Sequence, residues 1–141
     1  MKRLYFLCMA NVARSVMAER FARAWGQGHV EAFSGGIHRG KHVSRNATAV
    51  MLEVGIDISD HVPRRIDWRR AERCDRIVDV GTGRPVCPQH LEHKFEAWTV
   101  EDPHGTDLEV YRGVRDTVAR NVAALLEREG IAVPADAPGR R

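Results

Sequence analysis

The sequence predicts an α/β protein built as a single three-layer domain, with a parallel sheet between two layers of helices. Short apolar segments that suit buried strands alternate with segments of helical periodicity. The chain has 141 residues, the usual size of one domain, and 43% of them are hydrophobic, which is enough to form a core. Strands that alternate with amphipathic helices indicate a parallel sheet covered on both faces. The expected strands are residues 3–8, 30–35, 75–80 and 95–100.

Amphipathic segments fill the intervals between these strands. Ser15 is expected to cap the first helix and Ser44 the second, and a short helix is expected within 66–74. Residues 87–94 are expected to form a loop or a short helix. Apolar residues at helical spacing define the buried face of each longer helix: Met17, Phe21, Ala24 and Trp25 in the first, Ala47, Val50, Met51 and Val54 in the second, and Tyr111, Val114, Val118, Val122 and Leu125 in the last.

Residues 1–130 are expected to form the domain, and residues 131–141 a flexible tail. The formal net charge is +3, and basic residues are interspersed with acidic ones even around the densest stretch, 63–70. Without an aromatic stripe or a known motif, no nucleic-acid partner is expected. No apolar run approaches the roughly 20 residues that span a bilayer, so neither membrane insertion nor a signal peptide is expected. Three cysteines, an odd number, favour the reducing cytoplasm.

The loop from Cys8 to Ser15 joins the first strand to the first helix. Backbone N–H groups in a tight loop before a helix attract an anion, and ligands bind beyond the carboxyl ends of parallel strands. The planar fork of Arg14 matches two oxygens of a tetrahedral oxyanion. The same positive field favours the thiolate form of Cys8, and Ser15 can donate a hydrogen bond to its sulfur. The loop therefore predicts a nucleophile held beside an oxyanion cradle.

A proton donor for the leaving oxygen is expected on a second loop. Asp102 precedes Pro103 just after the fourth predicted strand. The carboxyl ends of parallel strands share one edge of the sheet, so this carboxyl group can act as a general acid there. An Asp-Pro pair is also a common turn, and the pattern alone leaves that alternative open.

Several motifs in order resemble the low-molecular-weight protein tyrosine phosphatase superfamily, which includes thiol-coupled arsenate reductases. They are "LCMANVARSVMAE" at 7–19, "SGG" at 34–36, "GIDISDH" at 55–61 and Asp102-Pro103. The resemblance implies a four-stranded parallel sheet in the order 2-1-3-4, with Cys8 as nucleophile and Asp102 as general acid and base. It implies no metal and no cofactor. The implied oxyanion loop consists of Met9, Ala10, Asn11, Val12, Ala13, Arg14 and Ser15, with Asn11, Ser15 and Ser34 in supporting roles.

The expected activity is phosphomonoester hydrolysis through a thiophosphate on Cys8, with a phosphorylated protein or a small phosphomonoester as substrate. Phosphotyrosine phosphatases of this family usually carry aromatic residues after the Asp-Pro pair, where this chain has His104 and Gly105. The alternative is arsenate reduction, with thioredoxin, a small external thiol or Cys87 resolving the intermediate. In such reductases a cysteine pair follows the third strand. Here Gly81 or a neighbouring residue stands at the first position, and Cys87 before Pro88 resembles the second.

Two further hypotheses give this protein a binding role instead of a catalytic one. An inactive oxyanion-binding module would retain the cradle without turnover. Zinc could be suggested by Cys87, His90 and His93, but the sequence offers no fourth ligand and the spacing matches no standard site. Cys74 precedes the third strand, so it is expected to lie far from Cys8 as a buried structural residue.

Overall fold

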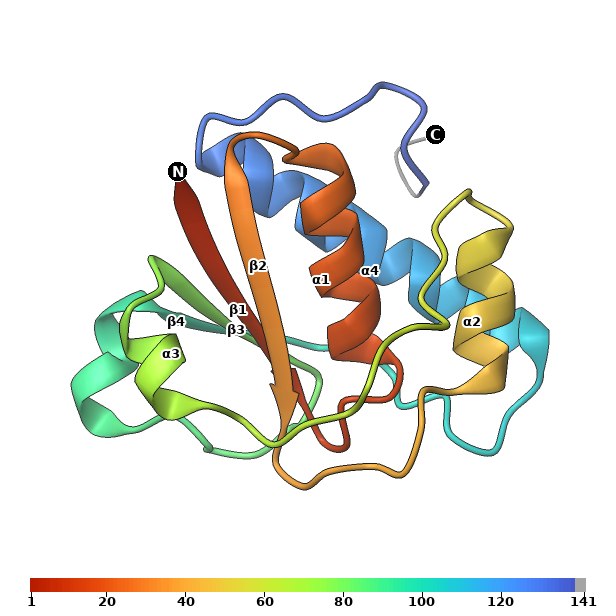
Figure 1. Cartoon of the computed structure of the whole chain (residues 1–141), viewed down its shortest axis with the longest axis horizontal. Helices are drawn as coiled ribbons and strands as arrows, with labels where there is room; N and C mark the ends of the chain where they lie inside the picture. Colours follow the sequence, from red (N-terminus) through yellow and green to blue (C-terminus); the bar gives the residue numbers. More distant parts are fainter. Residues whose placement is uncertain (139–141) are drawn as a thin grey trace.

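A four-stranded, all-parallel sheet in the order β2-β1-β3-β4 forms the centre of the molecule (Figure 1). The computed structural model describes residues 1–138. The predicted fold class and strand order are confirmed. Along the chain the elements are β1 (Lys2–Cys8), α1 (Arg14–Trp25), β2 (Val30–Gly36), α2 (Arg45–Leu52), α3 (Trp68–Glu72), β3 (Arg76–Val80), the 3-10 helix η1 (Gln89–Lys94), β4 (Phe95–Trp98) and α4 (Leu108–Arg128).

Alternation along β1 sends side chains into two cores, one on each face of the sheet. Leu4 and Phe6 pack with α1 and α4, whereas Tyr5 and Leu7 pack with residues of α3 and η1. Figure 1 shows α1 and α4 on one side of the sheet, with α2 beyond α4, and α3 on the other side. The larger core on the α1 side fixes the helix that follows the first loop.

The helix boundaries differ from prediction in informative places. Ser44 caps α2 as predicted, because its Oγ accepts the N–H of Ala47. Ser15 does not cap α1: the helix begins at Arg14, and the Ser15 hydroxyl faces inward. Ala24, expected on the buried face of α1, is exposed. The fourth strand ends at Trp98 rather than at residue 100, so the following backbone leaves the sheet and can contact another element.

The segment after Gly130, expected to be a flexible tail, lies against the domain for part of its length. Ile131 and Val133 pack against the larger core, and Ala137 is buried. Residues 139–141 of the expected tail lie outside the described residues. The flexibility of this segment stays a prediction. Among the helices of residues 1–138, none has the length and apolar character needed to cross a lipid bilayer.

Candidate active site

The loop between β1 and α1 keeps its N–H groups free for an anion because its carbonyl groups are occupied on the outside. The segment after β2 donates N–H groups to the carbonyls of Cys8, Met9, Ala10 and Val12, at 2.9–3.0 Å. Each planar peptide points its N–H away from its carbonyl. The N–H groups of residues 10–14 donate to no acceptor among the described residues. The loop therefore has unpaired N–H groups on the side away from its bonded carbonyls, and its role as an oxyanion cradle stays a prediction.

Two residues make this close packing possible. A Cβ on Gly36 would lie 2.8 Å from the carbonyl carbon of Ala10 and 2.9 Å from the N of Asn11, so only glycine fits beside the loop. Asn11 has a φ of 57°, in the left-handed region that asparagine tolerates better than most residues. Gly36, the second glycine of the "SGG" motif, is therefore required by its contact with the loop and not by its own strand.

A buried hydrogen-bond chain orients the Ser15 hydroxyl toward Cys8. The Cys8 side chain is 3% exposed, and its Sγ lies 2.9 Å from the Oγ of Ser15. Asn11 donates through Nδ2 to the hydroxyls of Ser15 and Ser34, both at 2.9 Å. Ser34 in turn donates to the carboxylate of Glu19. Because Ser15 accepts from Asn11, its own proton is available for a thiolate on Cys8.

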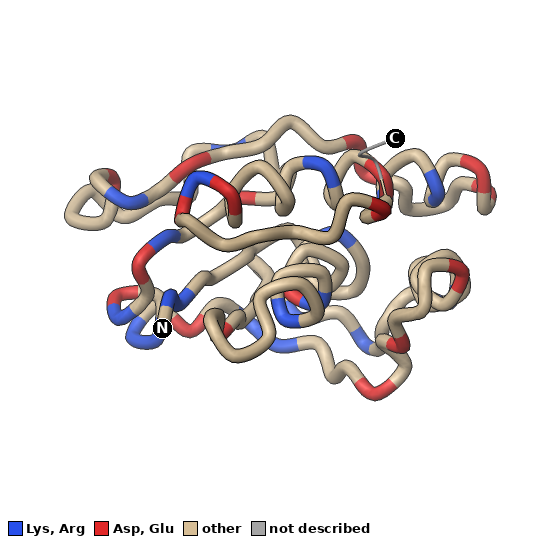
Figure 2. The backbone as a smooth tube through the Cα atoms, turned by 90° about the horizontal axis from the view of Figure 1, so that it is seen from above, with Lys and Arg blue, Asp and Glu red and all other residues tan. Residues whose placement is uncertain are grey.

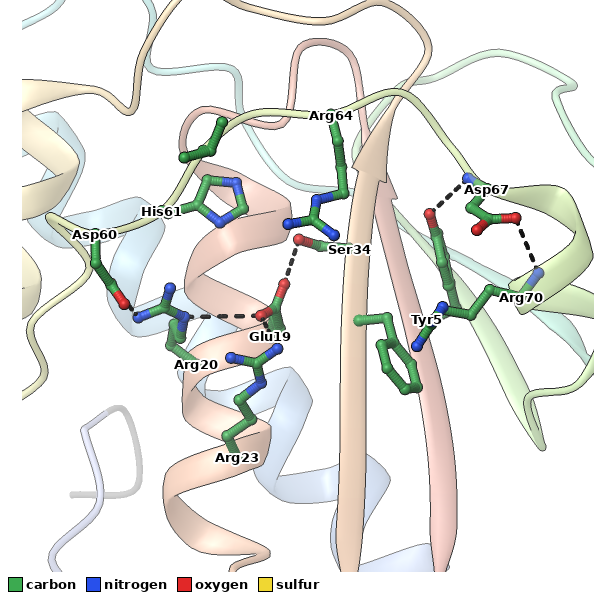
Figure 3. A pocket seen from close by; sticks show the side chains of 12 residues that line it. Tyr5, Glu19, Arg20, Arg23, Ser34, Asp60, His61, Arg64, Asp67 and Arg70 are labelled. Carbon is green, nitrogen blue, oxygen red and sulfur yellow. Dashed lines mark hydrogen bonds and ion pairs between the residues drawn. The ribbon is translucent and has the colours of Figure 1, made fainter.

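Glu19, at the far end of this series of hydrogen bonds, is held by ion pairs with arginines (Figure 3). Glu19 pairs with Arg23 at 2.7 Å and lies 3.7 Å from Arg20, which also pairs with Asp60 at 3.0 Å. Figure 3 shows Glu19 reaching from α1 toward Ser34 on β2. A cavity of about 320 Å³ lies beside these residues, and neither Cys8 nor Arg14 lines it. The cavity is lined by residues that support the loop from behind, and it does not include Cys8.

His61 holds the other side of Asn11. Its Nε2 lies 2.9 Å from the Oδ1 of Asn11, which also accepts the backbone N–H of Arg64 at 3.0 Å. Burial lowers the pKa of His61, although the nearby Glu19 carboxylate opposes this effect. A neutral His61 that donates from Nε2 satisfies this geometry. The sequence reasoning assigned no site role to Glu19 or His61, and their places in the quoted motifs were the available signal.

Two backbone carbonyls from distant turns hold the guanidinium of Arg14. The side chain is buried, and Nη1 donates to the carbonyl of Gly81 at 2.6 Å and to that of Val100 at 3.2 Å. Gly81 has a φ of 92°, and a Cβ there would lie 2.5 Å from the Val100 oxygen. The turn after β3 therefore requires glycine, and the early end of β4 brings Val100 to the arginine.

Asp102 lies on the loop after β4, as predicted, at the same edge of the sheet. Its Oδ2 is 3.7 Å from Nη2 of Arg14, and its side chain is 61% exposed. Its Oδ1 accepts the N–H of His104 at 3.1 Å, which fixes the turn. The structure therefore brings together Cys8, Arg14, Ser15 and Asp102. The catalytic roles of these residues stay predictions.

The other two cysteines lie in environments unlike that of Cys8. Cys74 is buried just before β3, and burial raises its pKa to about 11. Cys87 is half-buried against the smaller core, and its thiol donates to the carbonyl of Pro88 at 3.3 Å. Burial also raises the pKa of Cys87, with a smaller contribution from Glu92. All three thiols are free.

The residues suggested for zinc do not converge. His90 contacts Glu72 at 3.1 Å on the protein surface. Within residues 1–138, no group of three or more histidine, cysteine or acidic side chains is arranged to hold a metal ion.

Comparison with known proteins places this chain in a family. The family profile described as low molecular weight phosphotyrosine protein phosphatase matches residues 3–133. The chain belongs to this family. It is 38% identical to the glutaredoxin arsenate reductase of Synechocystis sp., over 91% of this chain and 98% of that protein. It is 34% identical to an arsenate reductase of Halalkalibacterium halodurans, over 89% of this chain and 96% of that one.

Solved structures from both branches of the family superimpose on this fold. An arsenate reductase in its phosphate-binding state gives a TM-score of 0.83 at 38% identity, covering 91% of this chain and 98% of that one. A low molecular weight protein tyrosine phosphatase from T. tengcongensis gives 0.82 at 26% identity, covering 91% and 99%. The shared fold therefore does not separate the two activities, whereas sequence identity is higher with the reductase.

Proposed function

We propose that this member of the phosphatase family reduces arsenate with an external thiol. The Cys8 thiolate attacks arsenic and displaces water after proton transfer, while Arg14 and the loop N–H groups hold the remaining oxygens. A thiolate then attacks the Cys8 sulfur. The S–S bond forms, the S–As bond breaks, and its electron pair reduces As(V) to As(III). A second thiol frees Cys8, so arsenate and two thiols give arsenite, a disulfide and water.

We choose arsenate as the substrate because the chain is similar to proteins named arsenate reductase. From the sequence alone, phosphomonoester hydrolysis is expected first and arsenate reduction second, and this similarity reverses that order. The loop after Asp102 also supports the choice. It continues with His104 and Gly105, without the aromatic side chains that would cover a phosphotyrosine ring. A small inorganic oxyanion needs only the cradle itself.

The surroundings of the remaining cysteines support an external thiol. The family resemblance puts Gly81 or a neighbouring residue where reductases of this family carry a cysteine, and a Cβ at Gly81 would lie 2.5 Å from the Val100 oxygen. Cys87 packs into the core on the other face of the sheet and is tied to Pro88. The proposed donor is a small thiol or a thioredoxin-like protein, and this chemistry suits the reducing cytoplasm.

Arsenite production by the purified protein tests the function. We expect thiol-dependent turnover by the wild type, and Cys87→Ser should retain it within about twofold because its thiol stays outside the reaction. The assay compares glutathione, 2-mercaptoethanol and thioredoxin with its reductase. Loss of turnover in Cys87→Ser, with folding intact by circular dichroism, would make Cys87 the resolving thiol. Absence of arsenite with every donor would reject the reductase.

Phosphomonoester hydrolysis is the second candidate, because Asp102 lies beside Arg14 where a leaving oxygen would depart. If Asp102 is the acid, Asp102→Asn should lower kcat/KM for phenyl phosphate about 100-fold, within the usual range for general acid catalysis. The loss should be smaller for p-nitrophenyl phosphate, whose leaving group needs less protonation. An equal loss for both esters would remove Asp102 from this role. Wild-type protein that binds phosphate without either activity would fit the inactive module.

A further inference from the structure

Three arginines and a histidine form a group beside the oxyanion loop. His38, Arg39, Arg64 and Arg65, here called the basic rim, line a pocket of about 510 Å³ together with Pro63. Among the described residues, none that lines this pocket is acidic. Its volume lies within the range of small-molecule sites, roughly 300–1,000 Å³. The rim therefore offers a cationic surface large enough for a small organic ligand.

The basic rim is fixed to the catalytic loop by its own backbone. The N–H of His38 donates to the Met9 carbonyl at 2.9 Å, and the N–H of Arg64 donates to Oδ1 of Asn11. Arg65 pairs with Gly36 in an isolated parallel bridge at the end of β2. Figure 1 shows the loop after β1 and the segments around residues 37–43 and 61–66 meeting at one edge of the sheet. The rim therefore lies against the carbonyl side of the loop that follows Cys8.

The rim arginines have no acidic partner, whereas eight of the 17 arginines within residues 1–138 pair with a carboxylate. Lys and Arg are interspersed with Asp and Glu over most of the backbone (Figure 2), and Arg20 and Arg115, for example, are paired with carboxylates at 3.0 Å and 2.7 Å. Among the described residues, no carboxylate pairs with the side chains of Arg39, Arg64 or Arg65. Arg64 also lines the cavity of about 320 Å³ together with Glu19 and Asp60, and Figure 3 shows its guanidinium beside Ser34. The rim charge available to a ligand is therefore that of Arg39 and Arg65.

We infer that the basic rim binds the carboxylates of a small peptide thiol that resolves the Cys8 adduct. The inference rests on the proposed reductase function and assigns a binding site to its co-substrate. Guanidinium groups match carboxylates as paired donors, and nearby cations favour the thiolate form of an incoming thiol. The bound thiolate forms the S–S bond to Cys8 as the S–As bond breaks, with the electron pair going to arsenic. A second molecule of the thiol then releases Cys8.

The test compares three small thiols at subsaturating concentration with a charge-reversed rim. The variant is Arg39→Glu/Arg65→Glu, and the probes are anionic glutathione, neutral 2-mercaptoethanol and cationic cysteamine. We expect kcat/KM for glutathione to fall about tenfold, as charge complementarity changes mainly capture of the charged partner. The value for 2-mercaptoethanol should stay within about twofold, and that for cysteamine should not fall. High salt should lower the wild-type preference for glutathione.

A control variant tests whether a change in the net charge of the protein, at a position away from the rim, has the same effect. Arg120→Glu, with half the charge change of the rim variant, replaces an exposed arginine on α4 whose side chain donates to Thr117 at 3.5 Å, and it should leave all three rates unchanged. An unchanged glutathione rate in the rim variant would overturn the inference and leave the reductase in place. An equal loss with all three thiols would also overturn it, pointing to damage of the oxyanion loop. A loss confined to a thioredoxin-coupled assay would assign the rim to a protein instead. No arsenite with any thiol would reject the function and the inference together.

Discussion

Replacing Cys8 with serine is expected to lower both arsenate reduction and phosphomonoester hydrolysis by at least about 1,000-fold. The serine hydroxyl stays protonated near neutral pH and is a poor nucleophile without a base beside it. Ser15 is oriented to donate to a thiolate and offers no such base. Arsenite formation and p-nitrophenyl phosphate hydrolysis measure the loss.

Binding should survive in this variant, because the cradle remains. Arg14 and the N–H groups of the loop are untouched, so phosphate titrated by calorimetry should bind Cys8→Ser within a few-fold of wild type. Cys87→Ser is the matched control for thiol loss and should remain active. A Cys8→Ser protein with more than a tenth of wild-type turnover would place the nucleophile elsewhere.

Arg14→Lys should lower kcat/KM at least about 100-fold while preserving the charge. In the present geometry one nitrogen of the guanidinium is held by the carbonyls of Gly81 and Val100. The rest of the fork is left to face an oxyanion. An ammonium group cannot hold both carbonyls and two substrate oxygens in that arrangement. Loss of one preorganised donor at an oxyanion costs about 10²–10³ in kcat, which sets the expected size.

Stability has to be separated from catalysis in this test. Leaving two buried carbonyls without the guanidinium should also lower the free energy of unfolding, by about 1–3 kcal/mol. Arg115→Lys is a suitable control, because Arg115 is buried on α4 and donates to the carbonyl of Val50 and to Glu53, away from the loop. It should lose stability in urea unfolding but keep kcat/KM. An Arg14→Lys protein with reduced stability and unchanged kcat/KM would make Arg14 purely structural.

Local patterns predicted the scaffold because they act over one or two turns of chain. The apolar segment before Cys8 and the periodicity after it predict a strand, a loop and a helix from neighbouring residues alone. The cradle follows from the same stretch, since Cys8 and Arg14 bracket a loop before a helix. Asp102 could be placed at the same edge because the carboxyl ends of parallel strands converge there.

Supporting roles were predicted for Asn11, Ser15 and Ser34. The contacts that link them to Glu19 and His61 escaped prediction because they join segments far apart in sequence. Ser15 has the sequence position of a helix cap, but packing beside Asn11 and Cys8 turns its hydroxyl inward. Ser34 meets Glu19 only because β2 lies alongside β1 with α1 packed against both. Such hydrogen bonds depend on which surfaces meet in the folded chain, and periodicity carries no information about that.

The sequence by itself determined the order of elements and predicted Cys8 as nucleophile and the loop after it as the oxyanion site, because hydrophobic spacing and a contiguous motif are local properties. Only the tertiary structure decided what holds and surrounds that loop. It brought the carbonyls of Gly81 and Val100 to Arg14 and packed Cys87 into the opposite core. Within residues 1–138, it also left the arginines of the basic rim without carboxylate partners. These outcomes depend on long-range packing, which sets the distances between groups that lie far apart in the sequence.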